Sequence, residues 1–121
     1  MTAKVKTALP NSLAVVTSSK RAEIPHGMDE TALAATPSSV AIGCRFPMDG
    51  ETEVILGRAS EVDPGTKPAF DSVLETPNKI IAVWTVEWKQ LLKTTVPSAH
   101  TRIRVWRNRS QEPDKIAIGW G

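Results

Sequence analysis

The sequence is poor in the residue types that build most recognisable catalytic and metal sites. It contains one cysteine, two histidines and no tyrosine among 121 residues. A single cysteine excludes an internal disulfide and a multi-cysteine zinc site. His26 and His100 stand alone and Cys44 lies among apolar residues, so no pair has the spacing of zinc ligands. We therefore predict no metal and no cofactor.

Long apolar runs and a strong net charge are also absent. The longest apolar run is far shorter than the ~20 residues that span a bilayer, and no early segment has the basic start and apolar stretch of a secretory signal. Fifteen basic and 13 acidic side chains leave a net charge of +2, which does not mark a strong polyanion binder. We expect a soluble, cytoplasmic protein without a membrane partner.

No nucleotide-binding loop and no catalytic set can be recognised. The seven glycines are scattered rather than clustered before a helix. Cys44 is most simply a small core residue, because it occupies an inward position of an apolar strand. Carboxylates such as Glu75 and Glu87 would have to meet through the fold to act as an acid and a base. The sequence disfavours an enzyme but does not exclude one, and we predict no catalytic residue from it.

Alternation of apolar and polar residues recurs along the chain, and helix periodicity is almost absent. Strands are predicted over residues 13–17, 40–46, 52–56, 69–74, 79–88, 91–96, 101–107 and 115–120. The pattern of 91–96 also fits a turn of helix. Short strands separated by frequent turn signals predict an all-β sandwich of about seven or eight antiparallel strands. We expect a single domain over residues 1–121, with two packed sheets rather than a closed barrel.

The first half contains one irregular segment and one predicted hairpin. Residues 18–39 carry turn signals and at most one short helical turn, over 30–35. Residues 40–46 and 52–56 are expected to pair around Asp49-Gly50, because glycine readily takes the positive φ of such a turn. The register that keeps apolar side chains on one face pairs Cys44 with Val54.

The second half holds all four tryptophans and is expected to form a meander of its last four strands. Residues 79–88 give the strongest strand signal, with one long apolar face that includes Trp84 and Trp88. The opposite face begins with Ile81 and Val83, so its first half should be covered as well. Trp120 either closes the edge of the core or packs on a partner chain.

Basic residues and tryptophans gather where acidic residues are missing. No acidic residue occurs between Glu87 and Glu112. That interval contains Lys89, Lys93, Arg102, Arg104, Arg107 and Arg109, together with Trp88 and Trp106. Alternation over 101–107 assigns Ile103 and Val105 to the core. It assigns Arg102, Arg104 and Trp106 to the outer face. The candidate binding residues are Arg102, Arg104, Trp106, Trp88 and Arg107.

Two interpretations of this Trp/Arg face remain open. It can be a local stack, in which guanidinium groups cover an indole and a neighbouring carboxylate such as Glu87 neutralises them. It can also be a binding face, because Trp and Arg are the residues most enriched at interface hot spots. Stacking on tryptophan would suit single-stranded nucleic acid, which the near-neutral net charge disfavours.

The order of strands and prolines from Phe70 to the end resembles a known family. The segment contains Thr76-Pro77, Val96-Pro97, a strand with Trp106 and a polar loop with Glu112-Pro113-Asp114. In order and spacing it is similar to the second half of small bacterial all-β proteins of the competence protein J type. The resemblance covers under half of the chain and carries over no functional residue. It implies a β-sandwich and inhibition of a partner nuclease.

These observations lead to three hypotheses about function. The first is a non-enzymatic protein-interaction module that binds another protein or itself through the Trp/Arg face. The second is a binder of single-stranded nucleic acid or of another anionic ligand at the same face. The third is an uncharacterised enzyme whose carboxylates and histidines meet only in the fold.

Overall fold

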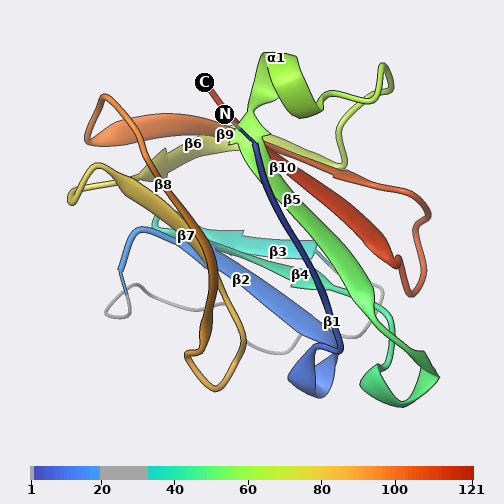
Figure 1. The fold of residues 1–121 in the computed structure, drawn as a ribbon. Coiled ribbons are helices and arrows are strands. Elements are labelled where there is room, and N and C mark those ends of the chain that lie inside the picture. Colours follow the sequence, from blue (N-terminus) through green and yellow to red (C-terminus); the bar gives the residue numbers. More distant parts are fainter. Residues whose placement is uncertain (1, 20–32) are drawn as a thin grey trace.

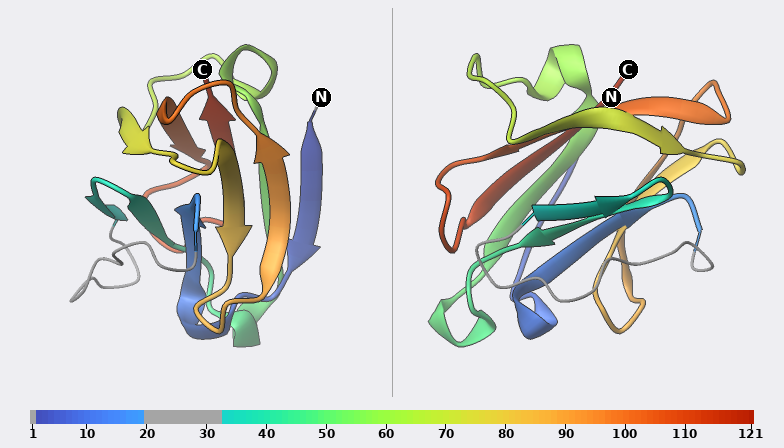
Figure 2. Two further views of the ribbon diagram at one scale, coloured as in Figure 1. Left: turned by 90° about the vertical axis from the view of Figure 1, so that its left-hand side faces the viewer. Right: turned by 180° about the vertical axis from the view of Figure 1, so that it is seen from behind.

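The computed structural model describes residues 2–19 and 33–121, which form ten strands in two sheets (Figure 1). Sheet A has the strand order β1-β5-β10-β9-β6, and sheet B has the order β3-β4-β2-β7-β8. The two sheets form separate layers, which the view from behind in Figure 2 also shows. The protein is therefore an all-β sandwich, as predicted.

The strands are short, and helical structure in the described residues is confined to single turns. Sheet A contains β1 (Ala3–Thr7), β5 (Thr52–Arg58), β6 (Phe70–Glu75), β9 (His100–Arg107) and β10 (Lys115–Trp120). Sheet B contains β2 (Leu13–Thr17), β3 (Leu33–Thr36), β4 (Ser39–Gly43), β7 (Ile80–Trp84) and β8 (Gln90–Thr95). The helical turns are η1 (Pro10–Ser12), η2 (Pro47–Asp49) and α1 (Ala59–Val62). Neighbouring strands are antiparallel except β5 and β10, which run parallel.

Aliphatic side chains at alternate strand positions fill the space between the sheets. Ile103 and Val105 of β9 are fully buried there, as predicted. Sheet A also contributes Val54, Leu56, Leu74, Ile116 and Ile118, and sheet B contributes Ala14, Val16, Val40, Ile42, Ile81 and Val83. Trp120 is half-buried against this core, which agrees with the interpretation that it closes the core edge.

The predicted hairpin of residues 40–46 and 52–56 is wrong, because β4 and β5 belong to different sheets. β4 pairs with β2 and β3, whereas β5 pairs with β1 and β10. The connection is held at the end of the sandwich, where the Cys44 N–H donates to the Ser12 carbonyl at 2.7 Å. Both strands are apolar enough to occupy interior positions of their sheets. The alternation of apolar residues therefore predicted the buried face of each strand correctly, but it did not predict the partner strand.

Of segment 18–39 the structure describes residues 18–19 and 33–39, and residues 33–39 are more regular than predicted. Residues 33–36 form strand β3, which a turn at residues 37–38 folds back onto β4. The helical turn expected over 30–35 is therefore wrong for residues 33–35, and residues 30–32 lie outside the described residues. Four residues are too few to show an alternating pattern, so β3 gave no strand signal. Strand β1 was missed because its inward face offers only the small Ala3 and one larger apolar residue, Val5, between two lysines.

The predicted strand 79–88 and the predicted meander need correction. Strand β7 ends at Trp84, and the chain turns at residues 85–88, where Trp88 has a φ of 63°. The core face of β7 carries Ile81 and Val83, while Trp84 is half-buried on the other face. Residues 91–96 do form a strand, β8, but β8 belongs to sheet B and β9 to sheet A. The last four strands are thus divided between the sheets.

Gly119 allows α1 to lie directly on β10. A Cβ atom at residue 119 would stand 2.7 Å from the Cα atom of Ala59 and 3.0 Å from the ring of Trp106. We expect Gly119→Ala to lower the free energy of unfolding by about 1–3 kcal/mol, because the added methyl overfills the contact. Urea unfolding measures the loss, with Ser72→Ala at an exposed position of β6 as the control. Equal stability of Gly119→Ala and the wild type would contradict this packing.

Candidate functional site

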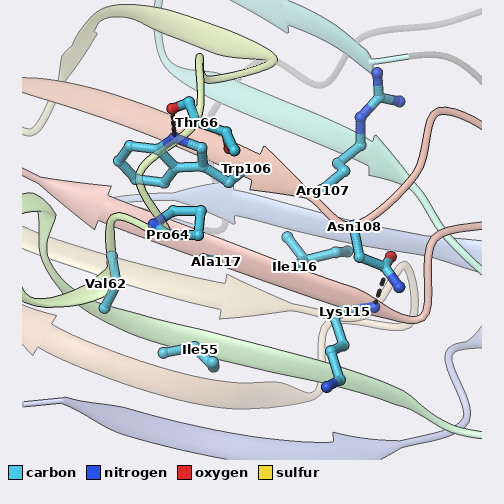
Figure 3. A pocket seen from close by; sticks show the side chains of 10 residues that line it. All are labelled: Ile55, Val62, Pro64, Thr66, Trp106, Arg107, Asn108, Lys115, Ile116 and Ala117. Atoms are coloured by element: carbon cyan, nitrogen blue, oxygen red, sulfur yellow. Dashed lines mark hydrogen bonds between the residues drawn. The ribbon is translucent and has the colours of Figure 1, made fainter.

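The outer face of sheet A is organised in rows, because paired residues on neighbouring strands point to the same side. One row runs across β5, β10 and β9 through Ile55, Ala117 and Trp106. The next row runs through Gly57, Gly119 and Arg104. The two glycines let α1 lie directly on the sheet, and Ala117 leaves a hollow beside α1 and the loop that follows it (Figure 3).

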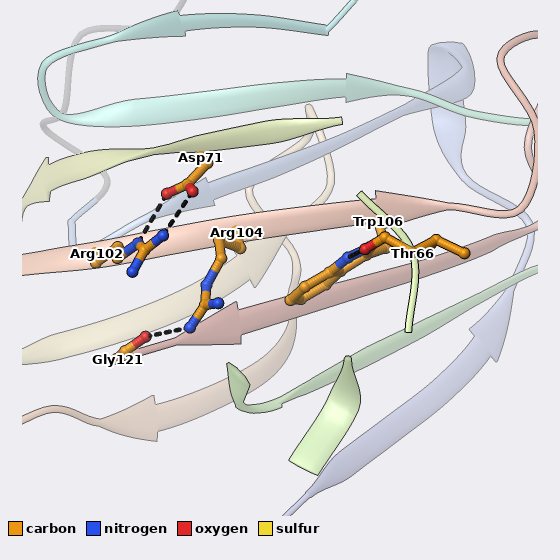
Figure 4. A network of polar contacts seen from close by, with 6 residues as sticks. All are labelled: Thr66, Asp71, Arg102, Arg104, Trp106 and Gly121. Carbon is orange, nitrogen blue, oxygen red and sulfur yellow. Dashed lines mark hydrogen bonds and ion pairs between the residues drawn. The ribbon is translucent and has the colours of Figure 1, made fainter. Parts of the chain in front are cut away.

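Trp106 lies on the outer face, as predicted, but it is covered. Its side chain is 3% exposed, and its indole Nε1–H donates to the carbonyl of Thr66 at 2.9 Å (Figure 4). The guanidinium carbon of Arg104 lies 5.9 Å from the centre of the indole ring. Arg104 also donates from Nη2 to the carbonyl of Gly121 at 2.9 Å. The indole therefore offers little free surface for stacking.

Arg102 is held by a two-pronged ion pair with Asp71 of β6 (Figure 4). Its Nε donates to Oδ1 at 2.9 Å, and its Nη2 donates to Oδ2 at 2.7 Å. These hydrogen bonds lower the pKa of the Asp71 carboxyl group. Glu87, the acidic partner suggested by the sequence, is wrong in this role, because it lies in the turn between β7 and β8 of the other sheet.

The other two predicted site residues, Trp88 and Arg107, do not lie in the rows that contain Arg104 and Trp106. Trp88 lies in the turn after β7 and contacts Trp84 edge to face, with ring centres 5.7 Å apart. Arg107 follows Trp106 at the end of β9, and its Nη1 donates to the Ser110 carbonyl at 3.4 Å. The structure therefore places Arg102, Arg104 and Trp106 on one face and Arg107 at the groove beside Trp106, whereas Trp88 lies apart in the other sheet.

An apolar groove of about 340 Å³ lies on the outer face of sheet A (Figure 3). It is lined by Ile55, Val62, Pro64, Thr66, Trp106, Arg107, Asn108, Lys115, Ile116 and Ala117. Ile55 and Ala117 come from the sheet beneath the groove, and Val62 and Pro64 come from α1 and the loop after it.

One end of the groove is basic. Lys115 and Arg107 line it there, and Arg107 also lines a neighbouring hollow of about 210 Å³ together with Lys67 and Arg109. Asn108 is fixed between the strands, because its Nδ2 donates to Oδ1 of Asp114 at 2.6 Å. An apolar cradle thus adjoins four cationic side chains, which together suit a ligand that is apolar at one end and anionic at the other.

Sequence reasoning missed most of the groove. It singled out Trp106 and Arg107, but not Ile55, Val62 or Ala117. The available signal was an outward isoleucine and an outward alanine in otherwise half-buried strands. These two residues indicate a groove only when β5 and β10 are known to be neighbouring strands. A parallel pair of strands that are distant in the sequence has no local sequence pattern by which it could be predicted.

Comparison of the chain with protein-family models, curated proteins and solved structures finds no match. The resemblance to proteins of the competence protein J type therefore stays a prediction. Among the described residues, no helix is long and apolar enough to cross a membrane. No group of three or more His, Cys, Asp or Glu residues is placed to hold a metal ion in residues 2–19 and 33–121.

Cys44 is a core residue, as its position in an apolar strand indicated. It is fully buried, and its Sγ–H donates to the Ile42 carbonyl at 3.2 Å. Burial raises the pKa of the thiol from 9.0 to about 12, so the nucleophilic thiolate is strongly disfavoured.

We expect the Cys44 thiol of the folded protein to resist a disulfide reagent at mildly alkaline pH and to react on unfolding. Because the folded pKa lies above the unfolded value of 9.0, the thiol also makes stability fall as the pH rises above 9.0. A colorimetric thiol assay with and without urea measures the reactivity. Met48→Cys, at a position 97% exposed, is the reactive control. Rapid labelling of Cys44 in the native protein would contradict its burial.

The Asp71 carboxyl group should titrate below the usual range of aspartate, because Arg102 hydrogen-bonds its charged form. Its contribution to stability is therefore present at neutral pH and is lost as the pH falls through the lowered pKa. NMR titration of the carboxyl carbon measures this pKa. We expect Arg102→Gln to raise it toward the ordinary value, and Arg104→Gln to raise it less. Identical titration in Arg102→Gln and the wild type would contradict the ion pair.

Proposed function

We propose that the protein is a non-enzymatic protein-interaction module. Its groove would receive one bulky apolar side chain of a partner protein, with acidic residues of the same segment lying at the basic end. The observation that carries the proposal is the continuity of the apolar groove with the basic hollow through Arg107. Inhibition of a partner nuclease, implied by the family resemblance, would be one instance of this function.

The size and apolar lining of the groove are consistent with the binding of one apolar anchor side chain from a partner. Its volume of about 340 Å³ is at the small end of ligand pockets, which suits one side chain rather than a large cofactor. Burying a leucine, methionine or phenylalanine side chain contributes roughly 1.5–3 kcal/mol. Even millimolar binding requires about 4 kcal/mol, so the anchor alone is insufficient and flanking contacts are needed.

The basic end supplies those flanking contacts. Lys67, Arg109 and Lys115 are exposed, and Arg107 is half-buried beside them. Such exposed charges attract a carboxylate from a distance and favour one orientation of the bound segment. Because they are solvent-exposed, salt should screen them, and their effect should be larger on the association rate than on the final affinity.

The burial of Trp106 favours a protein partner over single-stranded nucleic acid. Stacking of bases needs an open aromatic face, and the Trp106 side chain is only 3% exposed. Arg102 and Arg104 also have partners, in Asp71 and in the Gly121 carbonyl. The face expected to contact phosphates is thus largely occupied by contacts within the chain.

Filling the groove tests the proposal. We expect Ala117→Trp to weaken by about tenfold or more the binding of labelled peptides that carry one leucine, methionine or phenylalanine followed by two aspartates. Fluorescence anisotropy measures the affinity, and the NMR signal of the Trp106 indole N–H reports occupancy of the groove. Val73→Trp is the matched control, because Val73 lies 55% exposed on the same sheet face outside the groove. Absence of binding by every peptide, or equal binding by both variants, would refute the groove as the docking site.

A further inference from the structure

The loop between β4 and β5 presents apolar side chains to solvent. Among the described residues, the exposed large apolar side chains are Phe46, Met48 and Val73, and the first two belong to this loop. Met48 is 97% exposed and Phe46 is 40% exposed. The loop lies at the lower end of β5 in Figure 1. We call residues 46–49 the apolar finger.

The apolar finger is held in one conformation by its own backbone. The Asp49 N–H donates to the Phe46 carbonyl at 2.9 Å, and η2 begins at Pro47. At its base, the Arg45 N–H donates to the Pro113 carbonyl at 3.0 Å. Gly50 ends the turn with a φ of 134°, which favours glycine. Docking of the finger would therefore cost little conformational entropy.

The finger has the chemistry that the groove accepts. Met48 supplies an unbranched, adaptable apolar side chain that suits irregular cavities. Asp49 and Glu51 follow it directly and carry negative charge. The basic end of the groove offers Lys115 and Arg109, so the two surfaces are complementary in both polarity and charge.

The finger of a chain is separated from the α1 side of its own groove. Strand β5 begins beside the finger and ends at α1, and its seven residues span roughly 20 Å. A second copy with its β5 antiparallel to the first would bring each finger toward the groove of the other. In such a two-fold arrangement both fingers are docked and both grooves are filled, so the assembly stops at a dimer.

We propose that the groove is occupied by the apolar finger of a second copy of this chain, so that the protein forms a reciprocal dimer. This inference rests on the proposed function, since it names the partner of the same groove. Met48 is the anchor residue, and Asp49 and Glu51 lie against the basic end. Each copy contributes one finger and one groove.

Sedimentation velocity over a wide range of concentration tests the dimer. We expect the wild type to shift from monomer to dimer, and Met48→Glu and Ala117→Trp each to raise the dimer dissociation constant by about tenfold or more. An equimolar mixture of the two variants should associate better than either alone, because Met48→Glu keeps its groove and Ala117→Trp keeps its finger. That recovery also shows that both variants are folded. Val73→Trp should dimerise like the wild type.

Three results would overturn the inference: a wild type that stays monomeric at every concentration, a Met48→Glu variant that dimerises like the wild type, or variants whose mixture shows no recovery. The peptide assay separates this failure from failure of the proposed function. A monomeric protein whose groove still binds the apolar-acidic peptides would retain the proposed function and lose the dimer. A monomeric protein that binds none of them would lose both.

Discussion

The parallel pairing of β5 with β10 is the constraint on which the outer face of sheet A depends. It places Ala117 beside Ile55 and Gly119 beside Gly57. The two glycines let the turn α1 approach the sheet, and the alanine leaves a hollow beside it. A parallel pair needs a long crossover, and here the crossover contains four strands of both sheets. The groove is therefore a product of the global topology rather than of one local motif.

Hydrophobic burial explains why the indole of Trp106 is covered rather than open to solvent. A tryptophan can bury 150–250 Å², which corresponds to roughly 4–6 kcal/mol at about 25 cal/mol per Å². The cation–π attraction to a neighbouring arginine is only about 0.5–1 kcal/mol at an exposed site. The loop at Thr66 covers the ring and accepts its N–H, so burial leaves no polar group unsatisfied there. An outward tryptophan between arginines became a wall of the groove rather than an open stacking platform.

The sequence predicted which side chains of a strand point into the core better than it predicted which strands lie side by side. Alternation correctly assigned Ile103 and Val105 to the core and Trp106 to the outer face, because side-chain direction depends only on local strand geometry. It failed for the partner of β4 and for the acidic partner of Arg102, which proved to be Asp71. Both depend on which strands lie side by side, and several pairings satisfy the same apolar pattern. The groove was missed for this reason, since its residues come from three strands, the turn α1 and two loops.

The small net charge conceals a polarised molecule. Asp49 belongs to the apolar finger, and Glu51 and Glu53 follow it within a few residues, whereas residues 88–111 contain no acidic side chain. The fold gathers cations around the groove, and Glu53 pairs in register with Lys115 at its basic end, whereas Asp49 and Glu51 lie before the start of β5. Glu53 therefore offsets part of the charge of Lys115 within the chain, whereas screening by water and salt over about 8–10 Å weakens the attraction of the more distant Asp49 to the far side of the groove. A contact between two chains would bring Asp49 and Glu51 of one copy to the cations of the other, and the same contact would bury the apolar side chains beside each charged region.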